Sequence, residues 1–146
     1  MGKDIYFEAL RCPDQKVNPL FSFLGTRFIK AEDGHAVIEL PVSEKLAQGA
    51  GVVAGGILAT LADEAMAHAA MSLLEDGKQI VTTEMNIRYL RATNPKGKGT
   101  LIATGRVVKP GNSVITTDAE IHDENGRLLA TAGGSFFVLD AARFAK

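Results

Sequence analysis

The sequence predicts an α+β domain in which a mostly antiparallel sheet packs against one long central helix. Two observations carry this prediction. Segments that alternate apolar and polar side chains surround a single long apolar segment with helical spacing, in the order β-β-α-β-β-β-β. Asp-Gly and Asn-Gly pairs separate neighbouring strand segments, as they do in hairpins. The 146 residues can build one good core, so we expect a single domain over 1–146, with residues 1–17 as an N-terminal helical extension.

Composition and charge exclude several classes of protein. Hydrophobic residues make up 46% and charged residues 23% of the chain, which is typical of a globular protein rather than a disordered one. The net charge of −1 argues against nucleic acid or an anionic membrane as a partner. The sequence has no stretch near the ~18 apolar residues of a membrane span and no apolar signal core. The single cysteine, Cys12, cannot form an intrachain disulfide. We therefore expect a cytoplasmic protein.

The first third of the chain contains a short helix and a strand hairpin. Residues 4–11 carry apolar side chains at roughly helical spacing, and a proline follows them. Residues 26–30 lead into an Asp-Gly turn, and residues 35–42 then alternate with the period of a strand. The polar, glycine-bearing residues 43–53 are expected to form a loop.

Residues 55–74 form the one long helix of the prediction. Apolar side chains recur along it at the spacing of a buried stripe. The residues of that stripe are Ile57, Leu58, Leu61, Ala65, Met66, Ala69 and Leu73. We expect Asp76 and Gly77 to end the helix, because glycine is favoured just beyond a helix C-terminus.

The second half of the chain contains four strand segments, at residues 80–91, 100–108, 114–122 and 127–139. They are rich in β-branched residues or alternate in polarity, and turns containing Gly, Pro and Asn separate them. One helix cannot cover both faces of a six-stranded sheet. We therefore expect a second copy of the chain to cover what remains.

The most informative feature for function is a glycine pair followed, two helical turns later, by a carboxylate. Gly55 and Gly56 expose backbone N–H groups at the start of a helix, where negative charge binds. Asp63 is a charged side chain in an otherwise apolar helix, and burial of a carboxylate is costly. An anion-binding helix start and a buried carboxylate together indicate acyl-transfer chemistry.

The spacing of these groups predicts a composite site. Gly56 and Asp63 are seven residues apart, which is about 10 Å along a helix axis, on nearly the same face. A carbonyl bound at the helix start needs its attacking group about 3 Å away, beyond the reach of that aspartate. Two chains related by a two-fold axis solve this, because each gives its helix start to one site and its Asp63 to the other. We expect an active site at a dimer interface.

Five segments, in register along roughly residues 18–140, carry a resemblance to a known family. They are Phe23-Leu24-Gly25-Thr26, residues 34–42, residues 51–56 with Leu61-Ala62-Asp63, residues 84–90 and residues 126–131. Together they resemble the hotdog-fold acyl-CoA thioesterases of the phenylacetate-degradation (PaaI-like) type. The resemblance implies that the sheet wraps the long helix and that the protein hydrolyses an acyl-CoA to coenzyme A and a carboxylic acid. It also implies a homodimer, with two dimers forming a homotetramer.

The resemblance further implies roles for individual residues. The N–H of Gly55 would donate to the thioester carbonyl oxygen, and Asp63 would be the nucleophile or the general base that activates water. Thr82 would orient the water or the carboxylate, and Gln48 would lie beside the scissile group. No metal and no cofactor is implied, because coenzyme A arrives as part of the substrate.

Substrate contacts are expected from four more residues. Ala54 and Gly56, on either side of Gly55 in the sequence, are expected to contact the substrate, and Arg91 and Lys109 are candidates for the phosphates of coenzyme A. The family motif reads His-Gly-Gly, so Ala54 stands where a histidine is usual, and Gln48 stands where an asparagine is usual. Loss of an oxyanion-type donor typically costs about 100- to 1000-fold in rate.

Two alternatives to a thioesterase stay open from the sequence. The Ala54 departure also fits a non-catalytic acyl-CoA-binding dimer that has kept the fold, and a hotdog dehydratase is the third reading. His68 is turned away from Asp63 on the helix, so we expect it to pack in the core or at an interface. His35 and His122 are isolated from other ligand-type residues, and no metal site is expected.

Overall fold

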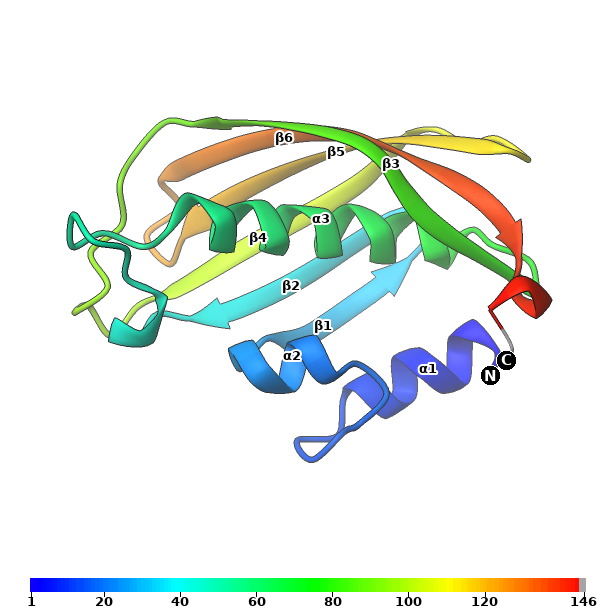
Figure 1. The fold of residues 1–146 in the computed structure, drawn as a ribbon, viewed down its shortest axis with the longest axis horizontal. Coiled ribbons are helices and arrows are strands. Elements are labelled where there is room, and N and C mark those ends of the chain that lie inside the picture. The colour runs from blue at the N-terminus through cyan, green and yellow to red at the C-terminus, as the bar shows by residue number, and fades with distance from the viewer. Residues whose placement is uncertain (145–146) are drawn as a thin grey trace.

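The computed structural model describes residues 1–144, whose strands form one sheet around a long helix. The helices are α1 (Lys3–Leu10), α2 (Pro19–Leu24) and α3 (Gly55–Ser72), with short 3-10 turns at Glu44–Leu46 and Ala141–Arg143; the strands are β1 (Arg27–Glu32), β2 (His35–Pro41), β3 (Lys78–Tyr89), β4 (Thr100–Lys109), β5 (Val114–Asp123) and β6 (Leu128–Asp140). The strand order is β1-β2-β4-β5-β6-β3, and every neighbouring pair is antiparallel. Figure 1 shows the sheet wrapped around α3, with α1 and α2 on the side of β1. The predicted α+β fold is confirmed.

The structure adds one helix that was not predicted. Asn18 begins α2, and its side-chain oxygen accepts a hydrogen bond of 3.2 Å from the N–H of Phe21. Pro19 occupies the first helical position, and Gly25 ends the helix in the left-handed conformation, with φ of 77°. The six residues span fewer than two turns, so no periodic pattern could reveal them.

The predicted buried stripe of α3 is confirmed along most of the helix and wrong at its end. Five of its members are buried, namely Leu58, Leu61, Ala65, Met66 and Ala69. Ile57 is only half-buried. Leu73 is 42% exposed because the helix ends at Ser72, before the predicted stop at Asp76 and Gly77, and Leu74 is buried in its place.

The helix α3 lies directly on the sheet because small residues meet at their contact. A Cβ added to Gly105 of β4 would overlap the carbonyl group of Ala65 and lie 2.8 Å from the backbone nitrogen of Met66. A Cβ added to Gly134 of β6 would lie 3.2 Å from Cε of Met66. Helix backbone therefore touches sheet backbone at Gly105 with no side chain between them, which fixes the position of α3 over β4.

A chain of polar contacts ties α1 and α2 to α3. The side-chain amide of Asn18 donates to the Tyr6 hydroxyl at 3.1 Å, and that hydroxyl lies 3.3 Å from Nε2 of His68. Nδ1 of His68 donates to the backbone carbonyl of Glu64 at 2.7 Å, which leaves Nε2 as the acceptor for Tyr6. The imidazole is 1% exposed. The aromatic rings around it are those of Tyr6, Phe7, Phe21 and Phe28.

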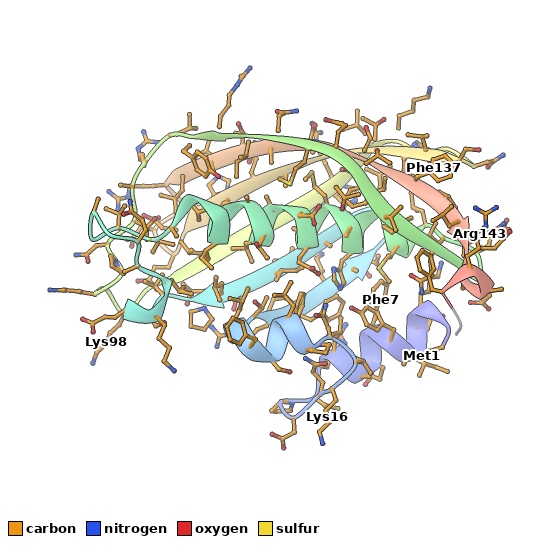
Figure 2. All side chains as sticks on the ribbon, in the orientation of Figure 1. Met1, Phe7, Lys16, Lys98, Phe137 and Arg143 are labelled. Carbon is orange, nitrogen blue, oxygen red and sulfur yellow. The ribbon has the colours of Figure 1, made fainter. Side chains whose placement is uncertain are left out.

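The core packing predicted for His68 is therefore confirmed. Figure 2 shows Phe7 directed from α1 toward the sheet, where its ring stacks on Phe28 with 5.3 Å between centroids. The two N-terminal helices thus cover α3 with aromatic side chains around one buried imidazole.

Burial shifts the pKa values of Glu64 and His68 in opposite directions. It raises the pKa of Glu64 to about 7, with the charge of Asp63 adding to the shift. It lowers the pKa of His68 to about 4. Because the pKa of His68 is lowered to about 4, its imidazole is neutral near pH 7, and the 3.6 Å approach of the two side chains is not an ion pair there.

None of the helices within residues 1–144 combines the length and the apolar content needed to span a bilayer. Over the same part of the chain, no three His, Cys, Asp or Glu side chains gather in an arrangement that could hold a metal ion.

Gly105→Ala is expected to destabilise the protein by about 3 kcal/mol, because the new Cβ meets helix backbone that cannot move aside. Gly49→Ala is the matched control, since an added Cβ there has nothing within 4 Å and the backbone is not left-handed. Urea denaturation measures both effects. Equal stability of the two variants would contradict the direct contact of α3 with β4.

Glu64→Gln is expected to change how the free energy of unfolding depends on pH. Between pH 4.5 and about 7 the folded protein keeps a proton on Glu64 that the unfolded chain has released, so this group's contribution to stability falls as pH rises. His68 acts with the opposite sign between about pH 4 and pH 6.5, because there the unfolded chain holds the extra proton. In the wild-type protein the two slopes largely cancel.

In Glu64→Gln the slope from His68 remains without the opposing slope from Glu64. The variant should therefore gain stability relative to the wild type as pH rises from about 5 to about 7. Urea denaturation at several pH values in this window measures the difference in unfolding free energy. A difference that stays constant with pH would show that Glu64 does not hold its proton in the folded state.

Candidate active site

Asp63 and Thr82 meet between α3 and the edge strand β3. Oγ1 of Thr82 donates a hydrogen bond of 3.0 Å to Oδ1 of Asp63. Burial raises the pKa of the Asp63 carboxyl above its ordinary value, and the hydrogen bond from Thr82 opposes that shift. The carboxyl group is half-buried, and within residues 1–144 its second oxygen has no hydrogen-bond partner. Such a carboxylate can take a proton from water or attack a carbonyl carbon.

A β-bulge in β3 places Thr82 and Tyr89 on the same face of the strand. The pairing of β3 with β6 shifts by one residue between Thr82 and Glu84, which leaves Thr83 as an extra residue. In a regular strand, residues an odd number apart face opposite sides of the sheet. Because of the extra residue, Thr82 and Tyr89 both face α3 although they are seven residues apart.

The start of α3 presents two free backbone N–H groups. Ala54 precedes the helix, and its side chain makes no capping hydrogen bond. Within residues 1–144 the N–H groups of Gly55 and Gly56 have no hydrogen-bond partner. Both groups point out of the positive end of the helix dipole, where an oxygen that carries negative charge is stabilised.

Tyr89 covers one side of this helix start. Its hydroxyl donates a hydrogen bond of 2.8 Å to the carbonyl oxygen of Gly55. A Cβ added to Gly55 would lie 3.1 Å from Cζ of the tyrosine ring. By contrast, a Cβ added to Gly56 would meet nothing within 4 Å, so the space at Gly56 is open to a ligand.

Within one chain these two groups of residues lie apart. The helix is unbroken from Gly55 to Ser72, so Gly56 and Asp63 are separated by about 10 Å along its axis. The fold brings Asp63 together with Thr82, and Gly55 together with Tyr89. The fold leaves Asp63 away from the helix start of its own chain, and the sequence spacing predicts this separation.

Gln48 and Arg91 lie at the helix-start end of the molecule. Gln48 is exposed in the loop before α3, and its side-chain oxygen accepts a hydrogen bond from the N–H of Ala50. Arg91 comes just after β3 and donates to the carbonyl oxygen of Leu128 at 2.7 Å. Each of these two side chains thus makes a hydrogen bond with backbone at this end of the molecule.

Lys109 lies at the other end of α3. It is the last residue of β4, whose first residue pairs with Pro41, where the chain enters the loop before the helix. Lys109 and the helix start are therefore separated by the length of a ten-residue strand. Lys98, in the loop before β4, lies at the helix-start end instead (Figure 2).

Tyr89 was not among the predicted site residues. Its distance of seven residues from Thr82 would put the two on opposite faces of a regular strand, and the bulge that reverses this contains no glycine to mark it. In the sequence Tyr89 is an aromatic residue in a predicted strand, where aromatic residues are common, so nothing marked it as a site residue.

Comparisons with known proteins point to one family. The profile of the thioesterase superfamily matches residues 50–130. A 1,4-dihydroxy-2-naphthoyl-CoA hydrolase from Listeria monocytogenes is 30% identical over 106 residues, which cover 73% of this chain and 84% of that protein. The structure of PaaI, from the phenylacetic acid degradation operon of E. coli, has a TM-score of 0.75 at 27% identity and covers 84% of this chain and 85% of its own. A hypothetical thioesterase from Streptococcus pneumoniae, crystallised with coenzyme A, has a TM-score of 0.71 at 29% identity, covering 79% and 89%.

The matched residues include both parts of the candidate site. Residues 50–130 contain the helix start, Asp63, Thr82 and Tyr89, and they make up more than half of the chain. The antiparallel sheet wrapped around one long helix is the hotdog fold, and PaaI is one of its structural neighbours. The chain therefore belongs to the thioesterase superfamily, in its PaaI-like type, and is a thioester hydrolase.

Proposed function

We propose that this protein is a cytoplasmic acyl-CoA thioesterase whose active site is shared by two protomers of a homodimer, with two dimers forming a homotetramer. The observation that carries the proposal is the separation of the helix start from Asp63 along an unbroken α3. Relatives support the substrate class, since one is named a hydrolase of an acyl-CoA and another was crystallised with coenzyme A.

The edge strand β3 is the surface on which a second copy would pair. It has twelve residues, most of them exposed, and within residues 1–144 no strand lies on its outer side. A long uncovered edge strand favours pairing with another chain. Antiparallel pairing of two β3 strands about a two-fold axis at Asn86, with Thr83 left out of the pairing by the bulge, would set Thr82 opposite Tyr89 of the partner subunit. Because Thr82 binds Asp63 and Tyr89 binds Gly55, Asp63 would then lie beside the helix start of the partner.

The reaction in such a site is divided between the two chains. The N–H of Gly55 holds the thioester oxygen, whose negative charge grows as the carbonyl carbon becomes tetrahedral. Asp63 of the partner subunit attacks that carbon or takes a proton from the attacking water, and Thr82 orients the carboxylate. The C–S bond breaks, coenzyme A leaves as a thiolate that gains a proton, and the oxygen of water ends in the carboxylic acid.

The other predicted residues fit this site to different degrees. Gln48, Ala54 and Arg91 lie at the helix-start end, where the scissile group and the adjoining part of coenzyme A would bind. Lys109 lies at the far end of its own α3, so it would reach coenzyme A only in the site formed with the partner. With Ala54 in place of the usual histidine, backbone N–H groups supply the oxyanion stabilisation at this position.

Release of free thiol from a panel of aryl-acetyl-, short-chain and medium-chain acyl-CoAs tests the function. Asp63→Asn should lower kcat at least about 100-fold on every substrate that the wild type cleaves, because asparagine neither accepts a proton nor attacks the carbonyl carbon. The assay is run in a Cys12→Ser background, since Cys12 is an exposed free thiol that would itself react with the reagent.

The panel also separates the competing functions. Hydrolysis that is unaffected by Asp63→Asn would remove Asp63 from the mechanism. Binding of acyl-CoAs without any thiol release would favour a non-catalytic acyl-CoA-binding dimer. Interconversion of enoyl and hydroxyacyl groups would point to a dehydratase.

Two substitutions at Gly55 test the role of its backbone N–H group. Gly55→Pro removes that group and suits the first helical position, because Ala54 before it is extended, with φ of −62° and ψ of 136°. Gly55→Ala is the matched control, since it makes the same Cβ contact with Tyr89 and keeps the N–H. We expect kcat to fall about 100-fold in Gly55→Pro and far less in Gly55→Ala.

Co-expression of Gly55→Pro with Asp63→Asn then tests whether the site is shared. In an equal mixture of chains, about one site in four combines an intact helix start with an intact Asp63, so about a quarter of wild-type activity should return. Native mass spectrometry verifies that mixed dimers are present. A mixture no more active than its parents would place the whole site within one chain.

A further inference from the structure

Tyr89 is a polar side chain at the helix start that the proposed reaction does not yet use. Its side chain contributes little to the core, because the residue is 51% exposed. Its specific contacts are the hydrogen bond to the Gly55 carbonyl oxygen, at 2.8 Å, and the approach of its ring to Gly55. The position of Tyr89 is therefore better explained by the helix start than by packing.

The carbonyl group that accepts this bond belongs to the same peptide group as the N–H of Gly56. A peptide group is planar, so holding its oxygen also sets the direction of its N–H. Donation to the oxygen polarises the group and makes the N–H a stronger donor, by about 10–30% per bond. The Gly56 N–H has no partner within residues 1–144, and an added Cβ at Gly56 would meet only open space.

The first turn of α3 needs such support. Helix ends fray, and the side chain of Ala54 does not cap this one. Apart from bonds within the helix, the Gly55–Gly56 peptide is held among the described residues by the Tyr89 hydroxyl. A glycine at position 55 allows the ring to approach, since any Cβ would crowd Cζ.

We propose that Tyr89 is a positioning residue of the thioester site. Its hydroxyl orients and polarises the Gly55–Gly56 peptide, so that the N–H of Gly56 becomes a second donor to the thioester oxygen beside the N–H of Gly55. This inference rests on the proposed function. It assigns the oxyanion stabilisation to two backbone donors and makes Tyr89 the group that prepares one of them.

The test compares Tyr89→Phe with Tyr6→Phe. These are the only two tyrosines of the chain, and both hydroxyls make hydrogen bonds, but that of Tyr6 lies among Asn18 and His68, away from the helix start. In Tyr89→Phe we expect kcat to fall about tenfold with KM changed less than about twofold, because the lost interaction acts in the transition state. In Tyr6→Phe we expect a lower melting temperature and an unchanged kcat.

A second readout does not depend on turnover. In ¹H–¹⁵N spectra of the free protein, the amide resonance of Gly56 should shift in Tyr89→Phe, while that of Gly49, in the loop before α3, should not. Size-exclusion chromatography checks that both variants keep the oligomeric state of the wild type.

The outcomes separate this inference from the proposed function. A Tyr89→Phe protein that keeps its full kcat, or that loses activity only through KM or through dissociation of the dimer, overturns the role of Tyr89. If the wild type releases no thiol from any acyl-CoA, the proposed function fails, and the amide resonance then decides. An unshifted Gly56 resonance overturns the inference, and a shifted one supports the contact of Tyr89 with the peptide.

Discussion

The direct contact of α3 with β4 is the constraint on which the rest of the structure depends. Because Gly105 has no side chain, the carbonyl group of Ala65 rests against sheet backbone, and α3 cannot rotate or slide without a steric clash. Asp63 lies two residues before this contact and Gly55 lies ten residues before it, on the same unbroken helix. The small residues of the contact touch no substrate. They nevertheless fix where the carboxylate and the helix start can act.

The strand β3 completes both parts of the site at two points along its length. Thr82 reaches Asp63 near the middle of α3, and Tyr89 reaches Gly55 at the start of the helix. Both contacts come from the one strand of the sheet that follows α3 directly and that has a free edge. An edge strand can present its two ends to the opposite ends of an identical strand. The same element therefore organises each half-site and supplies a surface on which the halves could meet.

Much of the fold and part of the site could be predicted from the sequence, for physical reasons that differ between elements. Apolar periodicity and the Asp-Gly and Asn-Gly turns are local signals, and they placed the strands and α3 to within about two residues. The predicted end of α3 was two residues too late. The observed end lies at a tertiary contact, in which Ser72 Oγ accepts a hydrogen bond from the N–H of Gly34. Tyr89 could not be assigned to the site without knowledge of the bulge. The raised pKa of Glu64 depends on burial in the folded chain, which no local pattern shows.

The bulge in β3 makes the site depend on the number of residues in the strand as much as on their identity. Removal of Thr83 would restore a regular strand in which Thr82 and Tyr89 are six residues apart, so both would still face α3. With the bulge kept, removal of one residue beyond it, such as Asn86, would instead turn Tyr89 away from α3 and Arg88 toward it. Substitutions along β3 leave this parity unchanged. Single-residue deletions beyond the bulge would therefore lose the arrangement in one step, whereas a deletion of the bulged residue itself would keep it.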